Sequence, residues 1–62
     1  MNQESVQEIE HRIERMDASI DRETARLAEL RGPARRQCQD GLDHLRYERH
    51  QLKQKLATMN HA

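Results

Sequence analysis

The fold of this chain is decided by residues 6–33, which read VQEIEHRIERMDASIDRETARLAELRGP. Apolar side chains recur in this stretch at alternating spacings of three and four residues, and only Glu23 interrupts the series. This repeat is the heptad pattern of a helix that packs along one apolar stripe. It predicts a helix over residues 5–31. Ser5 followed by Glu8 forms a capping box at the start of that helix.

The heptad pattern stops at residues 32–33, Gly-Pro, the one strong turn signal in the chain. Glycine adopts the left-handed conformation that ends many helices, and proline cannot continue a helix but can open the next one. Apolar residues then resume at Cys38 with the same spacings, although Arg49 occupies one apolar position. Gly41 is a weak point, because an interior glycine costs about 1 kcal/mol relative to alanine. The pattern predicts a second helix over residues 34–59.

Two helices joined by a tight turn run antiparallel. We therefore predict an all-α fold, an antiparallel two-helix hairpin with a coiled-coil seam, which forms a single domain over residues 1–62. The apolar seam side chains, expected to form the core and the dimer contacts, are Val6, Ile9, Ile13, Met16, Ile20, Leu27, Leu30, Cys38, Leu42, Leu45, Leu52, Leu56 and Met59. This seam is small for a chain of 62 residues, so we expect a homodimer that forms a four-helix bundle.

Two registers bring the seam positions of the two halves together. The first has a tight turn, uses the whole chain and places Ile13 opposite Leu52. The second places Glu23 opposite Arg49, so that the two misplaced charges meet, but it turns residues 31–41 into a long loop. Helix-to-helix connections of that length are uncommon, and much of the stretch consists of good helix formers. These considerations favour the tight turn.

Composition and charge exclude several classes of protein. Eleven basic and eleven acidic residues leave the chain neutral, with residues 1–31 carrying eight acids against five arginines and residues 32–62 carrying six bases against three acids. The halves therefore attract each other, but no overall field attracts nucleic acid or an anionic membrane. The longest apolar run has two residues, far below the roughly 20 that span a bilayer. With no signal-peptide pattern and a lone Cys38, we expect a cytoplasmic protein.

The sequence predicts no catalytic residue, metal site, cofactor or small-molecule substrate. A chain this short rarely encloses a pocket shielded from water. Cys38 lacks a base that would activate it, and it is expected to pack as a small apolar residue unless a dimer axis brings two copies together for a crosslink. The spacing that puts two metal ligands on one helix face occurs at Asp40 and His44 and again at His44 and Glu48. No two histidines have it, and there is no second cysteine.

The face of the second helix opposite the seam predicts protein binding. Tyr47, the one aromatic residue, lies there, and tyrosine is a common interface anchor. A tyrosine that only lies along its own helix would occupy the same position. The residues of the candidate partner-binding face are Arg46, Tyr47, His50, Lys53 and Gln54. We predict a non-enzymatic adaptor, co-chaperone or inhibitor that regulates a larger protein by occupying its surface. It resembles the short helical hairpins common in bacteria and phages.

Nucleic-acid binding is the alternative class. In length and two-helix layout the chain resembles the Rop-type plasmid RNA-binding proteins, and this resemblance implies a dimeric hairpin that binds RNA. Arg46, Arg49, His50 and Lys53 give the second helix a basic stripe that would serve such a function. The first helix, which such a protein would offer to RNA, is net acidic here, and the chain has no Phe or Trp to stack on bases. The sequence therefore favours a protein partner.

Overall fold

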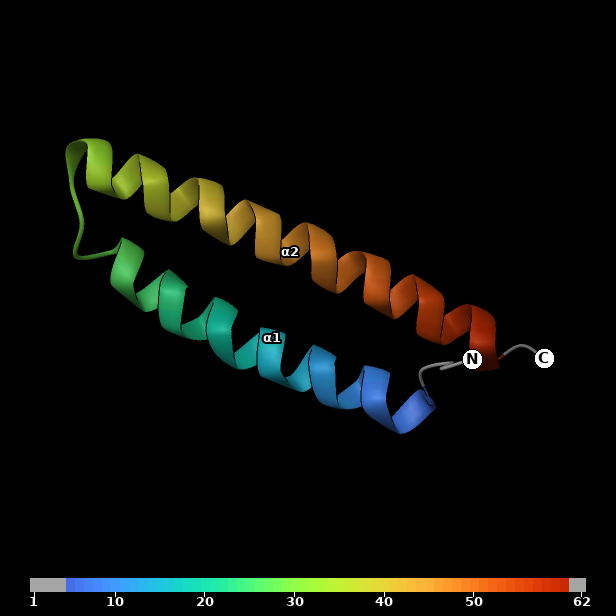
Figure 1. The fold of residues 1–62 in the computed structure, drawn as a ribbon. Helices are drawn as coiled ribbons and strands as arrows, with labels where there is room; N and C mark the ends of the chain where they lie inside the picture. Colours follow the sequence, from blue (N-terminus) through green and yellow to red (C-terminus); the bar gives the residue numbers. More distant parts are fainter. Residues whose placement is uncertain (1–4, 61–62) are drawn as a thin grey trace.

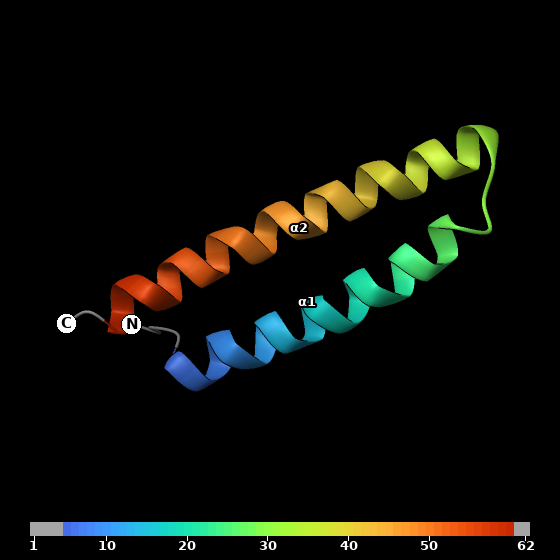
Figure 2. The ribbon, with the colours of Figure 1, turned by 180° about the vertical axis from the view of Figure 1, so that it is seen from behind.

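Two long helices lie side by side and antiparallel in the computed structural model, which describes residues 5–60 (Figure 1). Helix α1 covers Val6–Leu27 and helix α2 covers Gly32–Asn60. The view from behind shows the same pairing along the full length of α1 (Figure 2). The predicted all-α hairpin is thus confirmed. Between residues 5 and 60, neither helix has a stretch apolar enough and long enough to cross a membrane.

Helix α1 begins where the capping pattern places it. Ser5 has an extended backbone conformation, with φ −75° and ψ 162°. Its hydroxyl oxygen accepts a hydrogen bond from the backbone N–H of Glu8 at 3.2 Å, and its carbonyl accepts one from the N–H of Ile9 at 3.1 Å. The first bond satisfies a backbone donor that the first helical turn would otherwise leave without a partner, and the second is the first regular bond of the helix.

Helix α1 ends earlier than the sequence predicts. Its last helical residue is Leu27, not residue 31. The N–H of Glu29 donates to the carbonyl of Arg26 at 3.0 Å, and the N–H of Leu30 donates to the carbonyl of Leu27 at 3.2 Å. These bonds link residues three apart, so the end of the helix tightens into a 3₁₀-type turn.

The connection between the helices spans residues 28–31, and the expected turn at residues 32–33 is wrong by this measure. Packed helix axes lie about 8–10 Å apart, and a four-residue connection is within the usual length for a helical hairpin. Gly32 has a φ of +64° and opens α2 instead of closing α1. The left-handed backbone that the sequence indicates is therefore present, on the other side of the turn.

The register is that of the tight turn. Residues 32–41 are helical, which excludes the long loop that the alternative register requires. Ile13 and Leu52, which the tight turn places opposite each other, belong to the same core cluster. The two misplaced charges do not meet, since Arg49 lies against Asp17 instead, with its Nη1 donating to the Asp17 Oδ1 at 2.8 Å.

The core is concentrated at the end of the hairpin where α1 begins and α2 ends. Ile9, Ile13 and Leu52 form a buried cluster there, and Ile9 is fully enclosed with 0% of its surface exposed. Met16, Leu56 and Met59 pack against the cluster and are half-buried. Toward the turn, Ile20 and Leu42 are the buried side chains. The remaining seam residues are half-buried: Val6, Leu27, Leu30, Cys38 and Leu45.

Candidate functional site

An open groove of about 500 Å³ lies between the helices near the turn, and we call it the turn-end groove. Its apolar and small lining residues are Leu30, Ala34, Cys38, Gly41, Leu42 and Leu45. Its polar lining residues are Glu23, Arg26, Gln37 and His44. Apolar and small residues therefore make up the larger part of the lining, and both helices contribute polar groups.

Glu23 and Cys38 bridge the two helices inside the turn-end groove. The Cys38 thiol lies 3.4 Å from the Glu23 Oε2 and 3.6 Å from the Glu23 carbonyl oxygen, and it donates to both. Partial burial raises the pKa of the Cys38 thiol, and the neighbouring Glu23 carboxylate raises this pKa further, whereas Arg26 lowers it. A thiol with a raised pKa is mostly protonated near neutral pH and is therefore a poor nucleophile. The geometry agrees with a packing role for Cys38.

Gly41 forms part of the groove wall in the middle of α2. A Cβ atom built on Gly41 meets no other atom within 4 Å, apart from the local backbone of its own helix. Its φ is not in the left-handed region, unlike that of Gly32. Neither packing inside the chain nor backbone conformation therefore requires a glycine at this position, although an interior glycine costs about 1 kcal/mol of helix stability. The missing side chain leaves α2 open to a close approach from outside.

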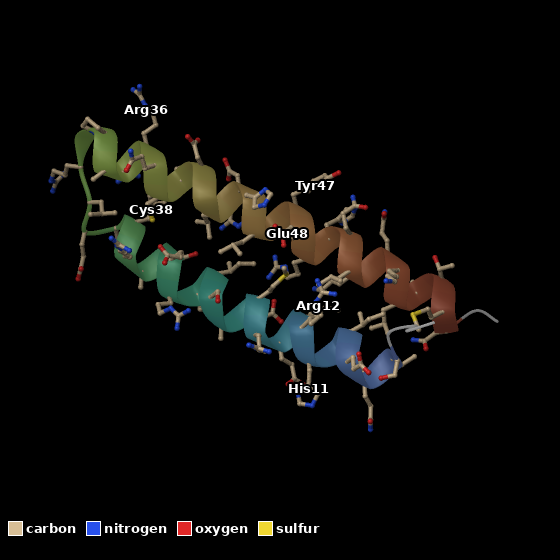
Figure 3. The ribbon with its side chains drawn as sticks, in the orientation of Figure 1. His11, Arg12, Arg36, Cys38, Tyr47 and Glu48 are labelled. Atoms are coloured by element: carbon tan, nitrogen blue, oxygen red, sulfur yellow. The ribbon has the colours of Figure 1, made fainter. Side chains whose placement is uncertain are left out.

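The outer face of α2, defined by Arg46, Tyr47, His50, Lys53 and Gln54, is the second candidate surface. All five side chains are exposed. Tyr47 points away from α1 (Figure 3). It is 62% exposed, and within residues 5–60 it is the one large hydrophobic side chain that is exposed and not partly buried. The helical spacing therefore gathers these residues on one accessible face, as the sequence indicates.

The two candidate surfaces lie on different parts of the molecule. The turn-end groove lies between the helices, whereas Tyr47 projects from the side of α2 that faces away from α1 (Figure 3). The heptad pattern indicates the outer face but does not by itself reveal the groove. Two irregularities of the heptad pattern, Glu23 in the seam of α1 and Gly41 beside the seam of α2, are the signal that could have located it, since both line the groove.

The histidines do not gather into a metal site in the part of the chain that the structure describes. Among residues 5–60, no group of three or more His, Cys, Asp or Glu residues could hold a metal ion. His44 pairs with Glu48 through its Nε2 one helical turn away, and both side chains are exposed. In Figure 3, His11 points away from α2. The His44–Glu48 pair is a local contact on the surface of α2.

Comparison with known proteins does not place the chain in a family. No protein-family model matches the chain, and no significant match was found among curated proteins or solved structures.

Proposed function

We propose that this hairpin is a non-enzymatic protein-binding module that works in the cytoplasm as an adaptor, co-chaperone or inhibitor. In this proposal it regulates a larger protein by occupying that protein's surface. The observation that carries the proposal is the 62% exposure of Tyr47 on the outer face of α2. A tyrosine buries a large area at low cost in conformational entropy when it enters a pocket of a partner.

The neighbours of Tyr47 supply the polar rim that such an anchor needs. Arg46 and Lys53 are exposed on either side of His50, at helical spacings that place all three on one face. Interfaces commonly surround a central aromatic residue with charged groups that steer the encounter and fix its orientation. An acidic rim around a tyrosine-sized pocket is the complementary surface on the target.

Self-association is part of the same proposal. Five side chains are buried in the described part of the chain: Ile9, Ile13, Ile20, Leu42 and Leu52. A domain of this size needs a larger core, or a second chain, to hold its fold firmly. We propose a homodimer in which two hairpins form a four-helix bundle, with the outer face of α2 left available for the target.

RNA binding is the second candidate function, and the exposed basic residues on the outer face are the observation that favours it. Arg46 and Lys53 would contact phosphate groups, and the Tyr47 ring would stack on a base. The neutral net charge of the chain gives little general attraction to a polyanion. The two functions differ in their salt dependence, because phosphate contacts release counterions and an apolar anchor does not.

The deciding experiment is affinity capture from the native host's lysate with tagged protein, in nuclease-treated and untreated samples. Wild-type protein is compared with Tyr47→Ala, Tyr47→Phe and a charge-reversal variant at Arg46 and Lys53. A protein target should be enriched in both samples, retained by Tyr47→Phe and lost with Tyr47→Ala. Enrichment of one RNA, lost after nuclease treatment, would establish the RNA-binding alternative.

Gln7→Ala is the matched control, because Gln7 is exposed on α1 and lies outside the outer face of α2. It should capture the target as well as the wild type does, with the same helical circular dichroism. Capture that survives both Tyr47→Ala and the charge reversal would refute the proposed face.

A further inference from the structure

The turn-end groove is an unfilled part of the seam. At the opposite end of the hairpin, Ile9 is 0% exposed, while Val6, Leu56 and Met59 around it are half-buried. Beside the groove, Leu30 and Leu45 belong to the same apolar stripes but stay half-buried. Apolar side chains therefore remain partly accessible beside the groove, although Leu42 in its lining is buried.

The shape of the groove admits a helix backbone. Gly41 has no side chain, and the space where its Cβ would lie is empty. Ala34 and Cys38, which lie seven and three residues before Gly41, also line the groove with small side chains. Helices pack with their axes about 8–10 Å apart, toward the shorter distance where small residues form the contact. A helix is thus the element that fits this surface best.

The charged side chains of α1 that line the groove favour a copy of the same chain. Glu23 and Arg26 lie one helical turn apart on α1, and both line the groove. In a two-fold interface, residue i of one chain meets residue j of the other and the reverse contact occurs as well. The partner's Arg26 can therefore approach Glu23 while Arg26 approaches the partner's Glu23. A surface that carries one charge of each sign, here Glu23 and Arg26, is self-complementary across a two-fold axis.

The chain exposes more surface than a compact chain of its mass would expose. The whole chain exposes 5183 Å², whereas a compact monomer of 7.4 kDa would expose about 4,200 Å². Its radius of gyration is 14.3 Å, against about 10.6 Å for a compact chain of this length. The excess area of about 1,000 Å² follows from the elongated shape of the hairpin, 46 × 21 × 15 Å, and it leaves room for the roughly 800 Å² that each partner contributes to a standard interface.

We propose that a second copy of this chain docks in the turn-end groove about a two-fold axis. A helix of the second copy lies against Gly41, and the Arg26 of the second copy lies beside Glu23. This inference rests on the proposed homodimer and specifies its interface. The dimer so formed covers the half-buried apolar residues near the turn. It leaves Tyr47 outside, because Tyr47 points away from α1 (Figure 3).

The test is sedimentation equilibrium of the purified full chain over a hundredfold range of concentration, with no target present. The wild type should dimerise reversibly. Gly41→Arg should weaken the dimer at least about tenfold in Kd, because the new side chain occupies the groove. Helicity should be retained, since a Cβ at Gly41 meets nothing within 4 Å. Gln51→Arg adds the same charge at an exposed position of α2 outside the groove, and it should leave the Kd unchanged.

A charge-swap series keeps the test decisive if Gly41→Arg disturbs folding. Arg26→Glu alters an exposed residue and should weaken the dimer, because it sets two carboxylates against each other. The double variant Glu23→Arg/Arg26→Glu restores opposite charges and should recover most of the affinity. A dimer unaffected by Arg26→Glu or by folded Gly41→Arg, or a double variant no stronger than Arg26→Glu, would refute the groove as the interface.

The outcomes separate this inference from the proposed function. A wild type that stays monomeric at every concentration would overturn both the groove interface and the homodimer, but target binding by the outer face would stand. A dimer that survives the variants would retain the homodimer and place its interface elsewhere. Loss of the dimer in Gly41→Arg, with the target still captured, would show that the two surfaces act separately.

Discussion

The two glycines of α2 should respond in opposite directions to the same substitution. Gly32 has a φ of +64°, and an L-residue in that region costs roughly 1–2 kcal/mol. The following Pro33 restricts the backbone of residue 32 further. Alanine also reduces the entropy of the unfolded chain, which recovers about 0.4–1 kcal/mol where the native conformation permits it. Gly32→Ala should therefore destabilise the hairpin by about 1 kcal/mol.

Gly41→Ala should stabilise the monomeric hairpin by about 1 kcal/mol, since the helix propensity of alanine is higher by that amount. A Cβ at residue 41 meets nothing within 4 Å, so no steric cost offsets the gain. The two variants should thus differ by about 2 kcal/mol, which corresponds to a ratio of roughly 30 between their folding equilibrium constants. Their Tm values should lie on opposite sides of the wild-type Tm, each displaced by about 4–8 °C.

Circular dichroism at 222 nm during thermal and urea unfolding measures both effects. The protein concentration must be low enough that sedimentation shows a monomer, because association would stabilise the folded state by mass action. Gly32→Asn serves as a control, because asparagine tolerates the left-handed region better than alanine does. Its loss of stability should be smaller. If Gly32→Ala matches or exceeds the wild type in stability, the conformation assigned to the turn is wrong.

Three further predictions concern the seam and its flanks. Leu42→Ala should destabilise the hairpin by about 3 kcal/mol in the same urea unfolding assay, because Leu42 is 1% exposed and its truncation leaves a cavity. Leu45→Ala should cost less, because Leu45 is half-buried. A double-mutant cycle on Asp17 and Arg49 should give a coupling energy below about 1 kcal/mol that shrinks with added salt, since both side chains are partly exposed. The alkylation rate of Cys38 by iodoacetamide should rise with pH at a higher midpoint in the folded chain than in urea, because burial and the adjacent carboxylate raise the thiol pKa. Equal midpoints in the folded and unfolded chain would contradict the contact between Cys38 and Glu23. The contribution of the thiol to stability is complete below its unfolded pKa and is lost as pH rises through its folded pKa.

The heptad spacing was sufficient to predict the architecture of this chain. Spacings of three and four residues on both sides of Gly32 require two apolar stripes, and an antiparallel pair buries both. The placement of the turn could not be predicted in the same way. Ala28, Glu29 and Leu30 are all good helix formers, so local propensity extends α1 through them. The structure ends α1 at Leu27, where the demands of reversing the chain override that propensity.

The candidate site was predicted in part, for a related reason. A helical wheel shows which residues point away from the seam, so the exposure of Tyr47 follows from its spacing alone. The turn-end groove depends on what two helices fail to fill between them, which no single-helix pattern describes. Glu23 and Gly41 each look like an isolated defect along the sequence. Their contribution to one groove becomes visible when both helices are present.

The position of the core gives the hairpin a distinctive response to mechanical load. The cluster of Ile9, Ile13 and Leu52 joins the first part of α1 to the second half of α2, and the start of α1 and the end of α2 lie together away from the turn (Figure 1). A force that pulls Ser5 and Asn60 apart therefore acts on this cluster first. Beyond that cluster, Ile20 and Leu42 are the next buried side chains on the way to the turn. Forced opening should therefore begin with rupture of the Ile9 cluster, and the unfolding rate of that cluster should govern the first event. The hairpin should therefore resist separation of its helices first at the end away from the turn.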